Sequence, residues 1–164
     1  MLPLHHESRA TVPASAANVF SYLDDHKRLS KHMTKSSWMM AGSSMSIQVD
    51  AAQGREVGSK ISLSGRVLGI PLSVDEVVIE RRPPLRKVWQ TEGVPHLLVM
   101  GPYRMGFDIE PQGESSVLCV FIEYVMPSNS FGRWFSFLGK FYARWCTQQM
   151  TDDAAANFKN GFQG

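Results

Sequence analysis

The sequence has few of the cysteines that form disulfide bonds or structural metal sites. It has two cysteines among its 164 residues, and Cys119 and Cys146 belong to no CxxC pair and no Cys/His cluster. A disulfide scaffold, a zinc site and a thioredoxin-like motif therefore gain no support, and no metal is expected. We expect two buried free thiols in a reducing compartment.

Long apolar runs and a strong charge bias are also missing. No run of about 18 apolar residues occurs, so no membrane span is predicted. Residues 1–7, MLPLHHE, lack the basic region and the apolar core of a signal peptide, and we expect a cytoplasmic protein. The net charge of +2, from 17 basic and 15 acidic residues, is too small to indicate a nucleic acid as partner.

Motifs for covalent and nucleotide chemistry are absent as well. We find no GxSxG, P-loop, GxGxxG or HExxH pattern, and no cofactor is expected. What the sequence does contain is an ordinary globular composition, with 43% hydrophobic and 20% charged residues. A chain of this length buries roughly 70% of its unfolded surface. Residues 1–164 are therefore expected to form one domain, with a core over about residues 4–158.

The first part of the chain predicts one strand followed by two short helices. Residues 5–12 have the pattern of a strand that ends at Pro13. Ser15 is the expected N-cap of a helix over residues 16–23, where apolar residues recur at helical spacing. Residues 26–33 predict a second short helix. Both helices are too short to be stable without a sheet to pack on.

The middle of the chain predicts a series of strands between residues 38 and 126. The predicted strands are 45–49, 59–67, 72–79, 85–91, 103–110 and 117–126. Their connections are too short for helical crossovers, so neighbouring strands are expected to be antiparallel. Closely spaced strands between helices indicate an α+β fold.

The last predicted element is a long amphipathic helix from residue 131 to about residue 150. Its apolar arc, expected to face the sheet, consists of Trp134, Phe135, Leu138, Phe141, Tyr142, Trp145, Cys146 and Gln149. The opposite, polar side consists of Arg133, Ser136, Lys140, Arg144, Thr147 and Thr151. Asp152 and Asp153 would fall on the apolar arc, so we expect the helix either to end near them or to run past the edge of the sheet.

Three segments and their order resemble a known superfamily. Residues 12–24, VPASAANVFSYLD, are similar to its opening "vpAspeeVwellxD", and Gly58-Ser59-Lys60-Ile61 is similar to the glycine that opens a central strand. Residues 80–89, ERRPPLRKVW, are similar to its "PPxrlxw" hairpin. Over residues 4–158 the chain resembles the START-like superfamily (SRPBCC, with the Bet v 1-like or helix-grip fold), in particular its polyketide cyclase/dehydrase and lipid-transport branch.

This resemblance implies a curved antiparallel sheet of about six to seven strands wrapped around the long C-terminal helix, with two short helices after the first strand. It also implies a cavity between sheet and helix that binds a hydrophobic small molecule or lipid. The absence of catalytic motifs favours a carrier. A cyclase- or dehydratase-like enzyme acting on an aromatic or polyketide substrate, and a protein-interaction module, remain as alternatives.

The candidate ligand-binding residues are large apolar side chains, together with one amide that interrupts the apolar arc of the helix. They are Trp38, Met40, Trp89, Tyr103, Met105, Phe107, Tyr124, Trp134, Leu138, Phe141, Trp145 and Gln149. Core packing and cavity lining require the same residue types, so the sequence does not separate the two.

Three ionisable residues are candidates for acid–base catalysis. His32 ends the second predicted helix, and His96 lies in a predicted loop that the resemblance places near the mouth of the cavity. Neither has a recognisable partner in the sequence. Glu123 interrupts the most apolar strand on its less apolar face, so we expect it to point outward. Pointing inward, it would be a candidate general base with a raised pKa.

Two further groups are expected on the surface. A basic cluster around Pro83 and Pro84 predicts a solvated hairpin. Its members are Arg81, Arg82, Arg86 and Lys87. An outward-facing apolar set on the last strand is a candidate homodimer face. It comprises Val117, Cys119, Phe121 and Val125.

Overall fold

The computed structural model describes residues 3–29, 44–67, 69–127 and 136–160. Its helices and strands follow one another as β1 (Leu4–Val12), α1 (Ala16–Leu23), α2 (His26–Leu29), β2 (Ser44–Val49), β3 (Lys60–Val67), β4 (Ile70–Arg82), β5 (Arg86–His96), β6 (Tyr103–Gln112), β7 (Ser115–Tyr124) and α5 (Ser136–Asn160). The α+β class and the order of elements agree with the prediction from sequence.

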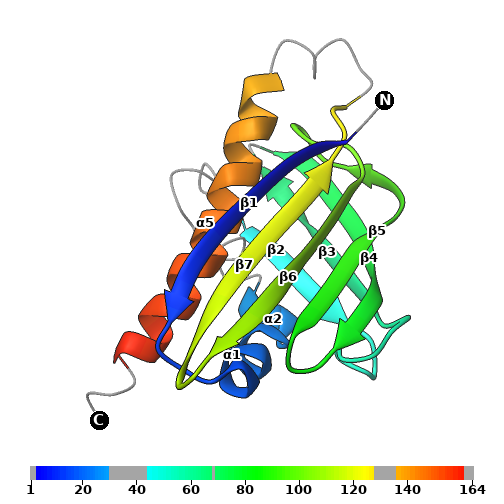
Figure 1. The fold of residues 1–164 in the computed structure, drawn as a ribbon. Coiled ribbons are helices and arrows are strands. Elements are labelled where there is room, and N and C mark those ends of the chain that lie inside the picture. The colour runs from blue at the N-terminus through cyan, green and yellow to red at the C-terminus, as the bar shows by residue number, and fades with distance from the viewer. Residues whose placement is uncertain (1–2, 30–43, 68, 128–135, 161–164) are drawn as a thin grey trace.

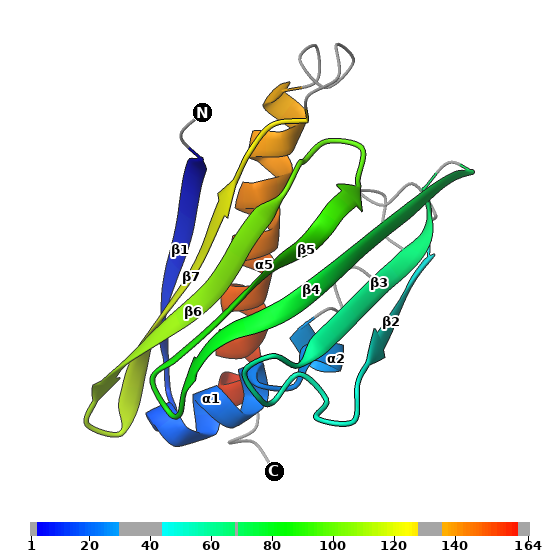
Figure 2. The same ribbon diagram turned by 90° about the vertical axis from the view of Figure 1, so that its right-hand side faces the viewer.

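The strands form one seven-stranded sheet in the order β1-β7-β6-β5-β4-β3-β2. Every pairing is antiparallel, because successive strands from β2 to β7 are joined by short connections, while β1 pairs with β7. The sheet curves around α5, with α1 and α2 at one end (Figures 1 and 2). The predicted helix-grip architecture is confirmed.

The start of α1 is set by its N-cap. The Ser15 side chain accepts a hydrogen bond from the Asn18 backbone N–H at 3.3 Å, which satisfies one of the free donors of the first turn. Phe20 on the buried face of the helix packs edge-to-face on Phe107, with ring centroids 5.6 Å apart. The predicted bounds of α1 are confirmed. The second helix is described over His26–Leu29, and residues 30–33 of the prediction lie outside the described part of the chain.

The largest differences between the predicted and the observed boundaries are at the ends of α5 and β5. Helix α5 continues to Asn160, past Asp152 and Asp153. These aspartates do not interrupt it because Asp152 is exposed, while Asp153 accepts a hydrogen bond from the Gln149 amide at 3.1 Å. The predicted loop at residues 94–96 is instead the end of β5, where the strand still pairs with β4. The predicted start of α5 at residues 131–135 lies outside the described residues.

The buried face of α5 is not the aromatic arc that the sequence predicted. It consists of Gly139, Ala143, Cys146, Thr147, Met150, Thr151 and Ala154. The two threonines, predicted on the polar side, are fully buried, and each hydroxyl donates to a carbonyl of its own helix, Thr147 Oγ1 to Ala143 O at 3.1 Å. Small side chains let α5 lie close to β1 and β7, whereas bulky aromatics would hold it away.

The aromatic side chains of the predicted arc lie beside the face of α5 that contacts β1 and β7, and not on that face. Phe141 is 49% exposed, and Tyr142 and Trp145 are half-buried. The sequence prediction assigned the buried face of α5 to its large apolar side chains. That assignment is wrong because close packing against the sheet favours small residues at the contact. None of the described helices is long and apolar enough to cross a membrane.

Candidate functional site

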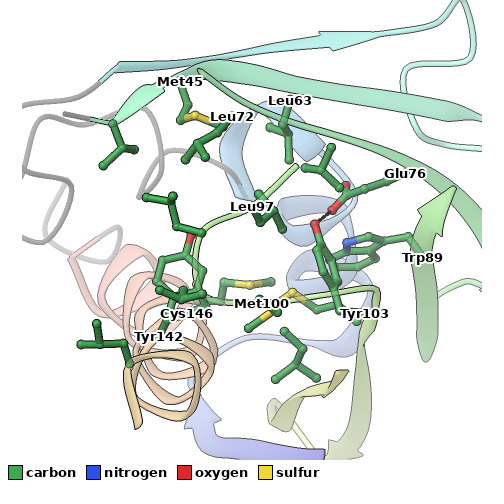
Figure 3. A pocket seen from close by; sticks show the side chains of 18 of the residues that line it. Met45, Leu63, Leu72, Glu76, Trp89, Leu97, Met100, Tyr103, Tyr142 and Cys146 are labelled. Carbon is green, nitrogen blue, oxygen red and sulfur yellow. Dashed lines mark hydrogen bonds between the residues drawn. The ribbon is translucent and has the colours of Figure 1, made fainter. Parts of the chain in front are cut away.

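A cavity of about 260 Å³ lies between the concave face of the sheet and α5. Its walls come from α2, from strands β2 to β7, from the connection between β5 and β6, and from α5. The lining residues are His26, Met45, Leu63, Val67, Leu72, Val74, Glu76, Trp89, Leu97, Leu98, Val99, Met100, Tyr103, Met105, Ile122, Leu138, Phe141, Tyr142, Cys146 and Met150. Figure 3 shows many of these side chains converging on one space from the strands and the helix.

The connection between β5 and β6 closes one side of the cavity against α5. Its residues 97–100 all contribute to the lining. A Cβ atom added at Gly139 would lie 2.5 Å from the Val99 carbonyl oxygen, closer than real contacts allow. Glycine at this position therefore lets the connection pass directly over the helix.

Glu76 is the one acidic side chain among the described lining residues. It alternates on β4 with the buried Val74 and Val78, and so it points into the cavity. Its carboxyl group accepts a hydrogen bond from the Tyr103 hydroxyl, drawn in Figure 3, and the Trp89 indole also acts to lower its pKa. Burial nevertheless raises the pKa of Glu76 to about 7, because removal from water disfavours the carboxylate more than these two neighbours favour it.

The other ionisable side chains described in the lining are uncharged near pH 7. Burial raises the pKa of the Cys146 thiol to about 12 and raises the pKa values of Tyr103 and Tyr142 well above their usual range. Burial together with the nearby Lys87 ammonium lowers the pKa of His26 to about 3. Near neutral pH, Glu76 is thus the described lining group poised between a charged and an uncharged form.

A buried ionic cluster lies next to His26, which is one of the lining residues of the cavity. Lys87 is 0% exposed, and its Nζ donates to Asp24 Oδ1 at 2.8 Å and to the Asp24 carbonyl at 3.2 Å. The same Nζ lies 3.2 Å from His26 Nδ1. Arg81 binds the Asp24 carboxylate with two nitrogens, at 3.2 and 2.8 Å. One carboxylate thus joins two cations from adjoining strands to the end of α1.

The solvated hairpin predicted for the basic cluster is therefore wrong for most of its members. Lys87 and Arg81 meet Asp24, while Arg86 binds Glu80 and Asp108 on the convex face. Desolvation acts to raise the pKa of Asp24, but the hydrogen bonds from Arg81 and Lys87 outweigh it and lower that pKa. The ion pairs offset the cost of removing these charges from water. Because the partners come from different segments of the chain, the pattern along one strand does not reveal them.

The structure brings only some of the predicted ligand-binding residues to the cavity. Five of them line it, namely Trp89, Tyr103, Met105, Leu138 and Phe141. Four others do not appear in its lining, namely Phe107, Tyr124, Trp145 and Gln149. Phe107 is core, packed on Phe20, and Gln149 bonds to its own helix. Trp38, Met40 and Trp134 lie outside the described residues.

The candidate acid–base residues lie away from the cavity wherever the structure describes them. His96 is exposed at the end of β5. Glu123 is on the convex face of β7, where its Oε1 lies 4.0 Å from His5 Nδ1. His32 lies outside the described residues. Glu76 and His26, which do line the cavity, were not among the candidates.

The sequence contained a signal for one of these two residues. Glu76 stands in register with Val74 and Val78 on a strand of alternating polarity, so its inward direction could have been predicted. His26 gave no comparable signal, because it follows a helix C-cap where no periodicity applies.

The outward-facing apolar set on β7 is partly covered by neighbouring side chains. The rings of Phe121 and His5 stack with their centroids 6.5 Å apart, and the Arg86 guanidinium lies 5.3 Å from the Phe121 ring centroid. Phe121 and Cys119 are both buried within the single chain. The homodimer face stays a prediction.

No protein-family model matches the chain, and no curated protein matches it by sequence. Solved structures match it along nearly its whole length. Norcoclaurine synthase from Thalictrum flavum aligns over 95% of this chain and 86% of its own, with a TM-score of 0.64 and 18% identity. TTHA0849 from Thermus thermophilus aligns over 94% of this chain and 98% of its own, with a TM-score of 0.66 and 14% identity.

A third match is the major latex-like protein 151 from Panax ginseng, which aligns over 96% of this chain and 99% of its own, with a TM-score of 0.60 and 12% identity. The chain has the Bet v 1-like fold. The resemblance to the START-like superfamily is thereby confirmed for the fold. Because a fold of this kind hosts carriers and enzymes alike, function in this Bet v 1-like chain depends on the cavity itself.

Proposed function

We propose that this Bet v 1-like chain binds a hydrophobic small molecule or lipid in the cavity between the sheet and α5. The observation that carries the proposal is the space itself, about 260 Å³ lined mainly by aliphatic, aromatic and thioether side chains. Protein cores are normally packed without voids of this size. An apolar ligand would release water from these walls, and that release is the main driving force for its binding.

The lining also favours tolerance of ligand shape. Four methionines line the cavity. They are Met45 on β2, Met100 in the connection between β5 and β6, Met105 on β6 and Met150 on α5. Thioether side chains are unbranched and polarisable, so they adapt to different surfaces at little energetic cost. A structural neighbour supports a small aromatic ligand, since norcoclaurine synthase has been crystallised with dopamine and hydroxybenzaldehyde.

Native mass spectrometry of the protein purified from its own host tests the proposal. A bound molecule adds mass under gentle desolvation and is lost on unfolding. Leu63→Trp, which fills the cavity from β3, is expected to abolish the added mass. Val57→Trp adds the same bulk at a side chain that is 64% exposed outside the cavity, and it should retain the ligand.

A ligand that exchanges during purification would leave no added mass, so a second measurement uses a defined probe. N-Phenyl-1-naphthylamine, which is uncharged, becomes fluorescent in apolar surroundings, and its emission should rise with wild type and with Val57→Trp. Equal emission with Leu63→Trp would contradict binding in this cavity.

An enzyme that moves a proton on a bound aromatic or polyketide-like substrate is the second candidate. The observation that favours it is Glu76, whose pKa burial raises to about 7 inside the cavity. A general base or acid works best with a pKa near the working pH. The Tyr103 hydroxyl, hydrogen-bonded to Glu76, would hold the carboxyl group in place.

The ring opening of 5-nitrobenzisoxazole tests this second candidate, because it begins with abstraction of one proton by a base. Glu76→Gln should remove any acceleration, since an amide is not a base near neutral pH, while His5→Phe on the convex face should retain it. A rate that is equal for wild type and Glu76→Gln would rule out Glu76 as the base.

A further inference from the structure

The histidine at the cavity wall has one ring nitrogen without a partner. His26 is 2% exposed, and it belongs to the cavity lining. Its Nε2 is buried and has no hydrogen-bond partner among residues 3–29, 44–67, 69–127 and 136–160. Native proteins satisfy nearly all buried polar groups, because a desolvated donor without an acceptor is destabilising. Because His26 lines the cavity, a molecule held there is the candidate partner for this atom.

The neighbours of His26 decide what Nε2 can do. Lys87 Nζ lies 3.2 Å from Nδ1, and an ammonium group can only donate. Nδ1 is therefore the acceptor, and the proton of the neutral ring is on Nε2. Gly54 lies on the same edge, where an added Cβ would come within 2.9 Å of Nδ1. The Nδ1 edge is thus enclosed by protein, and Nε2–H is the donor left over.

A second polar group lies at the same end of the cavity. The rings of His26 and Trp89 meet edge-to-face with centroids 4.8 Å apart, and the Trp89 indole also stabilises the charged form of Glu76. His26 and Glu76 therefore flank one indole. Away from it the described lining is mainly aliphatic, as with Leu63 and Leu97, although the Tyr142 hydroxyl and the Cys146 thiol of α5 also belong to it.

We propose that the cavity takes apolar molecules that carry a neutral hydrogen-bond acceptor, such as a ketone or ester oxygen, and that His26 Nε2–H donates to this atom. The inference rests on the proposed binding function and deepens it by naming the polar group of the ligand. A carboxylate ligand is disfavoured, because its charge would lie near the acidic Glu76 in a medium of low dielectric constant.

Two probes of nearly equal shape test this assignment. 2-Acetylnaphthalene carries a carbonyl oxygen where 2-ethylnaphthalene has two hydrogens. The readout is the ratio of the Kd of the ethyl compound to that of the ketone, measured by calorimetry. His26→Phe keeps a ring but removes the donor, and we expect it to lower this ratio roughly three- to tenfold, the value of one hydrogen bond. His5→Phe, the same substitution on the convex face, should leave the ratio unchanged.

The outcomes separate this inference from the proposed function. If both probes bind and the ratio is the same in wild type and His26→Phe, the donor role of His26 is overturned while binding in the cavity stands. If neither probe binds to wild type, both proposals are overturned.

A measurement on the wild-type protein covers the case in which His26→Phe does not fold. Long-range ¹H–¹⁵N correlation spectra report which nitrogen of each histidine ring carries the proton. We expect the His26 proton on Nε2, with a shift of that signal on addition of 2-acetylnaphthalene and a smaller shift with 2-ethylnaphthalene. A proton on Nδ1, or equal shifts with both compounds, would overturn the assignment.

Discussion

The Glu76 carboxyl group on β4 and the Tyr103 hydroxyl on β6 are hydrogen-bonded across the intervening strand β5, on the concave face of the sheet. Both side chains line the cavity, as does Trp89 of β5, whose indole also acts to lower the pKa of Glu76. This arrangement keeps an ionisable acid inside an apolar space, where its proton affinity is set by burial. The same acid, together with His26, gives the protein a distinctive dependence of stability on pH.

The two groups predict opposite slopes of stability against pH. The pKa of Glu76 is about 7 in the folded protein against 4.5 ordinarily, so its contribution to stability falls as pH rises from 4.5 through about 7. The pKa of His26 is about 3 against 6.5 ordinarily, so its contribution falls as pH drops from 6.5 through about 3. Between pH 4.5 and 6.5 the slopes, each about 1.4 kcal/mol per pH unit, should largely cancel in wild type.

Single variants should expose each slope. Relative to wild type, Glu76→Gln is expected to lose stability as pH falls from 6.5 to 4.5, because the His26 effect remains alone. His26→Phe is expected to lose stability as pH rises through the same range. Urea unfolding at a series of pH values measures both differences. Parallel profiles for wild type and both variants would contradict the placement of these groups.

Removal of the Tyr103 hydroxyl should raise the pKa of Glu76 further. The hydrogen bond from Tyr103 is the largest influence that lowers this pKa against the effect of burial. Tyr103→Phe keeps the ring and removes the donor, so the carboxylate loses stabilisation. Carboxyl ¹³C titration by NMR gives the pKa directly. Tyr22→Phe, on the other side of the core beside Phe158, should leave it unchanged, and an unchanged value in Tyr103→Phe would argue against the hydrogen bond.

The buried ionic cluster should respond unequally to loss of its members. Asp24→Ala leaves two cations, Lys87 and Arg81, without their carboxylate and is expected to cost about 3–5 kcal/mol of unfolding free energy. Lys87→Met should cost less, because Asp24 keeps its ion pair with Arg81 at 2.8 Å. Chemical denaturation gives both values.

The exposed pair of Lys60 and Glu92, 2.6 Å apart, provides the control for that comparison. Glu92→Ala should change stability by less than about 1 kcal/mol, since solvent screens such pairs. The interpretation of the cluster fails if Asp24→Ala is no more destabilising than Glu92→Ala.

Glycine at position 139 is expected to be required for tight contact with the β5–β6 connection. Replacing a helical glycine by alanine ordinarily stabilises a helix by about 1 kcal/mol. Here the new Cβ would lie 2.5 Å from the Val99 carbonyl oxygen, so Gly139→Ala should instead destabilise by about 1–3 kcal/mol. Thermal unfolding distinguishes the two signs. Lys140→Ala, at the exposed neighbouring position, should be close to neutral.

The sequence determined most of the architecture because periodicity is a local property. Alternating strands, the Ser15 N-cap and short connections predict an antiparallel sheet between helices, and these features are all present. The inward direction of Glu76 was also readable from its register with Val74 and Val78.

The tertiary structure alone decided which residues make the cavity. Helix α5 turns its small residues, such as Ala143 and Thr147, to the sheet, because contact distance is set by both partners and not by the helix pattern. Lys87 and Asp24 come from segments 63 residues apart, and only folding pairs them and gives His26 a fixed donor. Burial, which sets the pKa of Glu76, depends likewise on everything packed around it, and no single segment of the sequence contains that information.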